Sequence, residues 1–306
     1  MATFATSEQL LVVIDPAARH TDGESVRIAQ DVLGAGAAAK MCLPQDPEEF
    51  ARALARRGAR RPVVIGDDRA LLRAVTVLHR QRELAGCALA VVPVGDVRSL
   101  ARSLGVPDGP VAAARAVLEG AERRLDLLVD DSDGVVLGAL RIPPAPPRQA
   151  EADALGRLAG SAAVAVRTRR PWLRACRSLA RTLGAGPSRE PRGGGPGRPG
   201  GLAALGPARL RVEVDGLTVV DLDQPVEAVS ITPGGLRGRG AGTGTAVVEV
   251  RPASAGAQGF PLLTEGRTVT VSGADFRYRA DAVVSGPVRT RTWTVRAGAW
   301  GLTLPE

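Results

Sequence analysis

Two short segments combine glycine with charged residues in a way that could bind an anion. They are Gly66-Asp-Asp-Arg-Ala70 and Gly95-Asp-Val-Arg-Ser99. Because glycine has no Cβ, its backbone can approach a phosphate closely or adopt a positive φ. Arg98 could bind a phosphate through two parallel N–H bonds. It could equally be a solvated arginine at the start of a helix, which is the more common arrangement.

Other residue types that often carry chemistry form weaker patterns. The two histidines, His20 and His79, have no serine or cysteine partner that the sequence reveals, and the three cysteines lack the spacing of a metal site. Residues 130–134, Asp-Asp-Ser-Asp-Gly, resemble a calcium loop in their acids. They lack a glutamate at the closing position, so they are predicted to form a turn. We therefore predict no metal site from these residues.

The elements that position the glycine segments can be read from the apolar pattern. Apolar runs predict four buried strands, at 10–14, 61–65, 87–94 and 124–129. Helical spacing or helix-start residues predict four helices, at 25–33, from 46 onward, at 71–84 and at 111–118. Strands that alternate with helices need crossover connections. The N-terminal part is thus predicted to be an α/β domain with a mainly parallel sheet in a three-layer arrangement.

Beyond residue 131 the pattern changes to strands alone. Residues 134–142 predict one strand, and alternating apolar segments recur from 209 to 305 between Gly, Pro and Asp residues. Such alternation is typical of antiparallel strands with one buried face. We predict an α/β domain over 1–131 and an antiparallel β-sandwich domain over 132–306. The Gly/Pro/Arg tract at about 184–207 can build almost no core and is predicted to be a disordered loop.

Three segments resemble signature motifs of the diacylglycerol kinase and bacterial lipid kinase family. Residues 12–19, Val-Val-Ile-Asp-Pro-Ala-Ala-Arg, are similar to a family strand that ends in Asn-Pro. Residues 63–71 stand where the family has its Gly-Gly-Asp-Gly-Thr loop. Residues 92–107 resemble Pro-Leu-Gly-Thr-Gly-Asn-Asp-Phe-Ala-Arg-Ser-Leu-Gly-Ile-Pro, and residues 293–305 resemble the closing strands. The resemblance implies an NAD kinase-like N-terminal fold followed by a β-sandwich, with ATP and Mg²⁺ as cofactors and a lipid hydroxyl as the phosphate acceptor.

The polar positions of the first nucleotide motif are largely replaced. Gly66 and Asp68 are retained, whereas Asp67, Arg69 and Ala70 stand where the family has Gly, Gly and Thr. Asp67 adds negative charge and Arg69 adds bulk where phosphates would bind. The resemblance makes Gly66 and Asp68 candidate nucleotide-binding residues, and Asp68 is the one candidate catalytic residue. The replacements favour a different interpretation, in which Asp68 belongs to an acidic surface loop.

The second nucleotide motif and the acidic motif of the β domain are altered as well. Gly95 is retained and, with Arg98, completes the candidate nucleotide-binding set, but the family's Asn and Asp are absent. Ser99 is a favourable N-cap, so the following helix should still form. Where the family has Asp-Gly-Glu, this chain has residues 285–287, Ser-Gly-Pro. Asp275 and Asp281 are the acids near this position, and their spacing gives neither a role.

Positive charge is concentrated in one segment. The net charge is +8, yet residues 167–211 alone carry +10, from eleven arginines against Glu190. The stretch Arg167–Arg181 includes an amphipathic helix that could lie on an anionic membrane surface. Alternatively, the helix packs on the β domain with its arginines in water, which is the more ordinary arrangement. No aromatic pattern or motif supports binding to nucleic acid.

The sequence leaves two functional interpretations. No signal peptide or apolar run of about 20 residues is evident, so we expect a cytoplasmic protein, or one peripheral to the inner face of the membrane. The chain could be a lipid kinase with an unusual site. It could also be a pseudokinase that binds nucleotide, lipid or a protein without chemistry. Replacements at three separate motifs favour impaired or lost catalysis, whereas the acceptor lipid and oligomeric state stay open.

Overall fold

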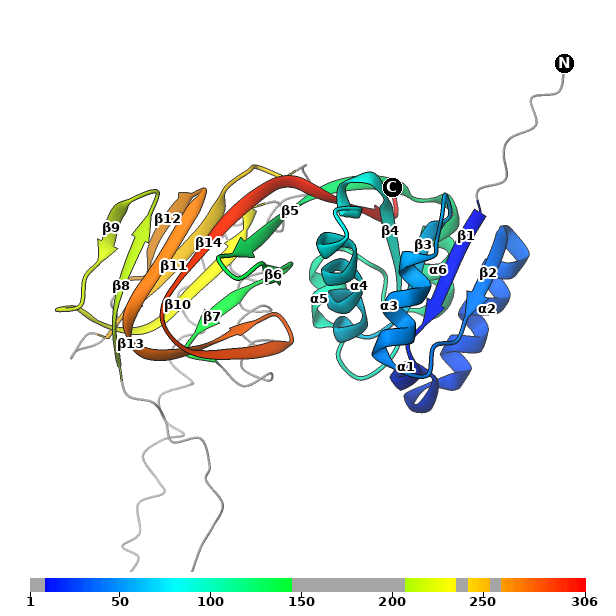
Figure 1. Cartoon of the computed structure of the whole chain (residues 1–306), viewed down its shortest axis with the longest axis horizontal. Helices are drawn as coiled ribbons and strands as arrows, with labels where there is room; N and C mark the ends of the chain where they lie inside the picture. The colour runs from blue at the N-terminus through cyan, green and yellow to red at the C-terminus, as the bar shows by residue number, and fades with distance from the viewer. Residues whose placement is uncertain (1–8, 145–206, 235–241, 254–259) are drawn as a thin grey trace, which may run out of the picture. The chain divides into compact units, whose positions relative to one another are not determined.

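A computed structural model describes residues 9–144, 207–234, 242–253 and 260–306 (Figure 1). These residues belong to one compact unit, formed by Met1–Ala145 and Gly206–Glu306. The predicted loop at about 184–207, up to residue 206, and the helix of the Arg167–Arg181 segment lie outside the described residues. The domain limits at 131 and 132 stay a prediction.

The N-terminal region is α/β, as predicted. Four parallel strands are paired in the order β4, β3, β1 and β2. They are β1 (Gln9–Ile14), β2 (Ala38–Cys42), β3 (Arg61–Gly66) and β4 (Ala88–Pro93). The helices between and after them are α1 (Pro16–Thr21), α2 (Gly23–Gly36), α3 (Pro47–Ala55), α4 (Asp68–Arg80), α5 (Ser99–Ser103) and α6 (Pro110–Glu119), with a 3₁₀ turn, η1 (Leu84–Gly86).

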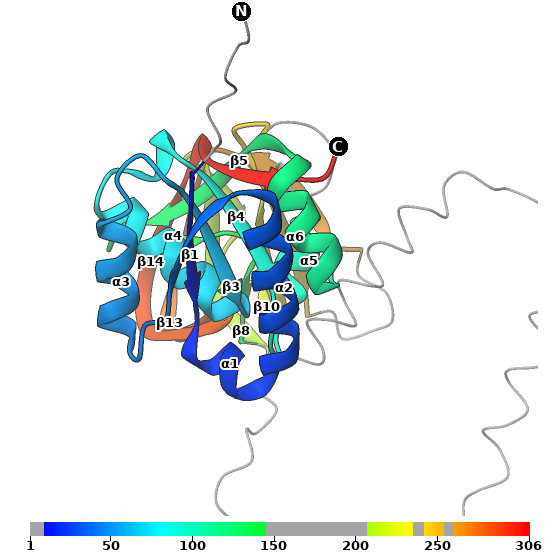
Figure 2. The same cartoon turned by 90° about the vertical axis from the view of Figure 1, so that its right-hand side faces the viewer.

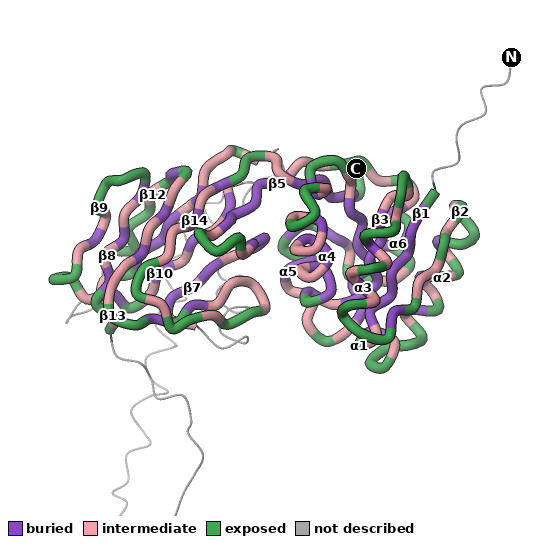
Figure 3. Tube along the Cα trace, in the orientation of Figure 1, coloured by how far each residue is buried: buried purple, intermediate pink, exposed green. Residues whose placement is uncertain are grey.

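Both faces of this sheet are covered by helices, which explains the continuous apolar runs of its strands. Alternate residues of one strand enter different cores: Leu11 and Val13 pack with α3, α4 and α5. Leu10 and Val12 pack with α1, α2 and α6. Figure 2 shows α3 and α4 on one side of the strands and α2 and α6 on the other. Strands β1, β3 and β4 are almost entirely buried, whereas the edge strand β2 and the outer faces of the helices are partly exposed (Figure 3).

Local capping sets where the helices begin. The Asp46 carboxylate accepts from the backbone N–H of Glu49 at 2.7 Å, and α3 begins at the following Pro47, as predicted. The helix predicted at 71–84 instead spans Asp68–Arg80. It begins three residues earlier than predicted because Asp67 is its N-cap. The 3₁₀ turn η1 then occupies residues 84–86.

The C-terminal region is rich in antiparallel strands. It comprises β5 (Ala121–Asp130), β6 (Val135–Val136), β7 (Leu140–Ile142), β8 (Ala208–Val214), β9 (Leu217–Val220), β10 (Pro225–Pro233), β11 (Ala246–Pro252), β12 (Leu262–Gly266), β13 (Thr268–Ala280) and β14 (Val283–Leu304). The single strand predicted at 134–142 is wrong. It is divided into β6 and β7, because residues 137–139 leave the ladder and bond a side chain.

The last strand completes the core of the α/β region. β14 pairs with β5 along much of its length, and its Gly301 and Leu302 pair in parallel with β4. A register shift separates Arg296 from Trp300, at a bulge where Gly298 has φ +54°. Trp300 is fully buried beside α/β core residues, with Leu302 and Leu304 in the same cluster.

Cys42 and Cys87 are free thiols. None of the helices in the described part of the chain is long and apolar enough to cross a membrane.

Trp300→Ala should lower the free energy of unfolding by about 3–5 kcal/mol, because it removes a fully buried indole from the core that β14 shares with the α/β region. Val283→Ala, on the same strand but 47% exposed, should cost less than about 0.5 kcal/mol. Urea unfolding followed by far-ultraviolet circular dichroism measures both. The wild type should therefore unfold in a single step. Two steps, with Trp300→Ala changing only the step of the strand-rich region, would contradict a core that β14 shares with the α/β region.

Candidate functional site

The chain leaves three neighbouring parallel strands at one edge of the sheet, and the predicted nucleotide segments follow them. Asp15 comes after β1, Gly66 ends β3, and Gly95 follows β4. Backbone bonds join these segments: Asp15 N–H to Ile65 O at 2.9 Å, Val94 N–H to Gly66 O at 3.0 Å, and Asp68 N–H to Val97 O at 2.8 Å. In open α/β sheets, ligands bind outside the carboxyl ends of the strands. The structure therefore brings the predicted residues together at the place where a site is expected.

The two retained glycines are required by the packing of these segments themselves. A Cβ on Gly66 would lie 2.6 Å from Cβ of Ala70 and 3.0 Å from Cβ of Asp15. Gly95 has φ +117°, and a Cβ there would lie 3.2 Å from Cβ of Asp67. Both glycines thus have a structural reason that does not involve a ligand, and their part in binding nucleotide stays a prediction.

Asp67 occupies the N-terminus of α4. Its Oδ1 accepts from the backbone N–H groups of Arg69 at 3.0 Å and Ala70 at 3.1 Å. The first N–H groups of a helix lack partners within the helix, and together with the helix dipole they attract anions. At the start of α4 the Asp67 carboxylate is that anion.

Asp68 is buried, with 2% of its surface exposed, so its interpretation as part of an acidic surface loop is wrong. Its Oδ2 accepts from Leu100 N–H at 2.8 Å and from Ser99 Oγ at 3.2 Å, and its Oδ1 accepts from Ala101 N–H at 3.0 Å. The carboxylate therefore ties the first turn of α4 to the first turn of α5. Desolvation raises the pKa of Asp68, although these three donors act in the opposite direction.

Ser99 is not the N-cap that the sequence predicted. It is the first residue of α5, Arg98 holds the N-cap position without a capping side chain, and Asp68 caps the helix from another element. Arg98 is half-buried at the helix start, and its Nη1 donates to the carbonyl of Asp108 at 3.3 Å. The prediction that Arg98 stands at a helix start is confirmed.

Sequence reasoning missed Arg73 and gave Asp15 no partner. Arg73, on α4, places Nη1 3.4 Å from Oδ1 of the buried Asp15 and sets its guanidinium 5.4 Å from the ring centre of Phe50. Arg73 is six residues after Asp67, a spacing that does not put the two on one face of a helix, so only the fold shows that Arg73 meets Asp15. Arg69 is exposed.

The strand-rich region contains two acids that are bound by backbone N–H groups. Asp281 accepts from the N–H groups of residues 137, 138 and 139, at 2.7, 2.8 and 2.9 Å. Desolvation raises its pKa to about 6. Asp126, which sequence reasoning missed, is buried and accepts from Gly244 and Gly298 at 2.8 Å each. Asp275 is exposed and pairs with Arg289.

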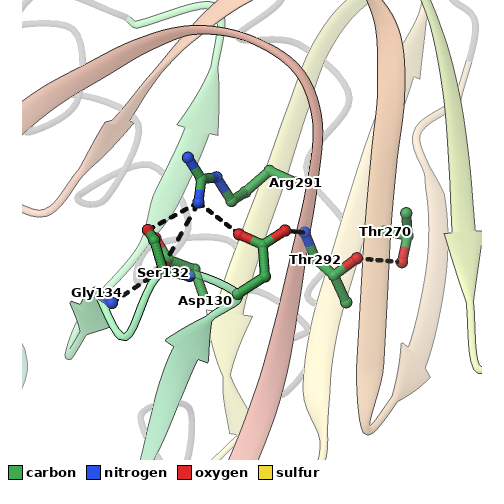
Figure 4. A network of polar contacts seen from close by, with 7 residues as sticks. Asp130, Ser132, Gly134, Thr270, Arg291 and Thr292 are labelled. Carbon is green, nitrogen blue, oxygen red and sulfur yellow. Dashed lines mark hydrogen bonds and ion pairs between the residues drawn. The ribbon is translucent and has the colours of Figure 1, made fainter.

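The acidic segment 130–134 is a turn, as predicted. Asp130 Oδ1 accepts from Ser132 N–H, Ser132 Oγ and Gly134 N–H, each at 2.8 Å. Arg291 of β14 pairs with Asp131 and donates to Ser132 Oγ at 2.7 Å (Figure 4). These carboxylates hold the turn against β14. Within the described ranges, no group of three His, Cys, Asp or Glu side chains could hold a metal ion.

Asp68→Ala should lower the free energy of unfolding by about 2–4 kcal/mol, because it leaves the N–H groups of Leu100 and Ala101 without their acceptor. Asp96→Ala, at an exposed acid of the same segment, should change it by less than about 0.5 kcal/mol. Chemical denaturation compares the two variants. Equally small losses would show that Asp68 does not hold α5.

Comparison with known proteins shows what the α/β region is similar to. Residues 9–129 match the diacylglycerol kinase catalytic domain. Among solved structures, a diacylglycerol kinase from Bacillus anthracis str. Sterne shares 13% identity with this chain over 98% of each chain, with a TM-score of 0.65. Two further structures from that organism, named as candidate diacylglycerol kinases, share 11% and 13% identity, with TM-scores of 0.64 and 0.63, over 98% and 97% of each chain. At such identities these structures support the fold alone.

Among proteins with curated descriptions, none matches the sequence. The domain match covers all three motif segments and the strands and helices that carry them. Residues 9–129 are thus similar in sequence to the diacylglycerol kinase catalytic domain, and the whole described chain is similar in fold to these solved structures.

Proposed function

We propose that this chain is a diacylglycerol kinase-family protein in which phosphoryl transfer to a lipid has been lost, and that it acts as a nucleotide-, lipid- or protein-binding module. The observation that carries the proposal is that the Asp67 carboxylate, which stands where the family motif has glycine, caps α4. In the family, the corresponding loops are expected to hold the phosphates of ATP.

Carboxylates cannot replace the donors that a phosphate needs. An ionised carboxylate and a phosphate both accept hydrogen bonds, so they compete for the same backbone N–H groups. The N–H groups of Arg69 and Ala70 are bound by Asp67, and those of Leu100 and Ala101 by Asp68. A phosphate entering here would also meet charge repulsion, of about 4 kcal/mol for two unit charges 4 Å apart at an effective dielectric constant of about 20.

The remaining residues supply little to offset this. Arg98 donates to the carbonyl of Asp108, and Arg73 is paired with Asp15. In β14, residues 285–287 present no carboxylate where the family resemblance expects two acids, so no general base is evident there. The residues present do not fit ATP and Mg²⁺ in a catalytic arrangement, and we derive no transfer step through them.

A second candidate function is a lipid kinase with an unusual site. Its specific support is the retention of Gly66, Asp68 and Gly95 at the carboxyl edge of the sheet.

The finer features of the fold belong to the proposal as well: a three-layer α/β domain and a β-sandwich. We also propose peripheral contact with an anionic membrane through Arg167–Arg181. This segment lies outside the described residues.

The proposal predicts no transfer of labelled γ-phosphate from Mg-ATP to a mixed bacterial lipid extract in vesicles. An active lipid kinase in the same vesicles serves as the positive control, and circular dichroism verifies that the chain is folded. Labelled lipid above the blank with the wild type, lost in Asp68→Asn, would contradict the proposal and establish the second candidate.

A restoring variant tests the physical cause. Asp67→Gly, Arg69→Gly and Ala70→Thr together recreate the family loop and free the N–H groups at the start of α4. The triple variant should bind Mg-ATP at least about tenfold more tightly than the wild type in equilibrium dialysis, because a competing anion is gone. A control with Arg69→Gly and Ala70→Thr alone keeps Asp67 and should not gain affinity. Equal affinity in all three proteins would show that Asp67 does not block the site.

A further inference from the structure

Four large apolar side chains are exposed at one end of the strand-rich region. They are Leu222, Phe260, Leu262 and Leu263, which expose 45%, 86%, 42% and 61% of their surface. Three of them lie at the start of β12, which pairs with β11 alone among the described strands. Large apolar groups that gather on a surface mark a place where another surface binds. We call these four residues the apolar end.

The pairing of the strands brings these residues to the same end. Leu262 of β12 is opposite Val250, near the end of β11. Ala253, which follows β11, donates its N–H to the carbonyl of Pro225 at 2.8 Å. Pro225 is the first residue of β10, and Leu222 lies in the turn just before it. The start of β12, the end of β11 and the start of β10 are therefore neighbours.

The chain also leaves and rejoins the strand-rich region here. β7 ends at Ile142, which is opposite Val229 of β10, and β8 begins at Ala208, which is opposite Val226. Residues 145–206 join these two strands and contain eleven arginines against three acids. A strongly cationic stretch of chain is thus attached beside the apolar end at both of its own ends.

The charged side chains of this end give no net attraction for an anion. Arg209 is exposed, but so are Asp223 and Glu227, and Arg251 pairs with Glu249 at 3.0 Å. The described surface contributes apolar area, and residues 145–206 contribute positive charge. Peripheral binding to an anionic bilayer depends on both, because apolar burial and electrostatic attraction add together and one weak anchor alone holds a protein only marginally.

We propose that the apolar end inserts into the surface of an anionic bilayer, beside the arginines of residues 145–206. This insertion rests on the peripheral contact proposed above for Arg167–Arg181, and it supplies the second anchor that such a contact needs. Only side chains enter, and only the interfacial layer, because the outer N–H and C=O groups of β12 need water as a partner and the hydrocarbon core has none.

Two other occupants share the apolar chemistry: a second copy of the chain paired along β12, and this chain's own segment 171–183. Pro261, just before β12, has no N–H to donate to an added strand, which disfavours the second copy. Either occupant would cover the apolar end in the absence of lipid. Membrane insertion instead leaves it in water until vesicles are added, and this difference is what the first test measures.

The first test places the fluorophore NBD on the full chain at Phe260→Cys, with the three natural cysteines replaced by serine and folding verified by circular dichroism. Vesicles of equal parts phosphatidylglycerol and phosphatidylcholine should shift the emission to the blue, and nitroxides on the lipid acyl chains should quench it. Leu217→Cys is the control, because Leu217 is 75% exposed at the opposite end of β8 and should show neither change. Emission at residue 260 that is already blue-shifted without vesicles, and unchanged by them, would show that protein covers the apolar end and would overturn the proposal.

Co-sedimentation with the same vesicles tests the insertion without a label. Phe260→Ser combined with Leu262→Ser should lower the partition coefficient at least about tenfold, because two large apolar side chains no longer leave water. Leu217→Ser should leave it unchanged. A double variant that binds as tightly as the wild type would overturn the insertion while leaving the contact through the arginines in place. A wild type that does not bind anionic vesicles at all would overturn both.

Discussion

The start of a helix leaves backbone N–H groups that need a partner, and in this protein two adjacent aspartates provide it. Asp67 binds the N–H groups at the start of α4, and Asp68 reaches across to those of α5. These bonds fix the segments that follow β3 and β4. Gly66 and Gly95 pack against Ala70, Asp15 and Asp67 as a result, and Arg73 is left to balance Asp15. The edge of the sheet where the family would hold phosphates is built around carboxylates.

The surrounding frame keeps this arrangement in place through packing. Strands β1, β3 and β4 are buried on both faces, and β14 returns from the strand-rich region to place Trp300 and Leu302 in one of the two cores. On the other side of α5, Leu100 packs with Leu137 and leaves no space for a side chain at Gly138. The fold of the matched domain is thus present although the polar residues of the motif segments differ from those that the resemblance leads us to expect. This combination is possible because core packing and site chemistry depend on different residues.

Much of the fold could be predicted from local pattern, whereas the bonds of the site could not. The apolar runs at 10–14 and 61–65 are strands because both of their faces are buried, and that burial is visible in the sequence. The helix start at Asp46 could be predicted because the Asp46 carboxylate and the Glu49 N–H from which it accepts are three residues apart. Asp68 and Leu100 are 32 residues apart, and Asp281 and Leu137 are 144 apart. Periodicity reports which residues are buried but not which carboxylate meets which N–H group. Ser99 was therefore given a capping role that belongs to Asp68.

The most direct test of the account observes the four N–H groups themselves. In amide NMR spectra of the full chain, titration with Mg-ATP should leave the resonances of Arg69, Ala70, Leu100 and Ala101 unchanged, because their donors are already bound by Asp67 and Asp68. Saturable shifts of these resonances in the wild type would show that ATP phosphates displace the carboxylates, and would contradict the account.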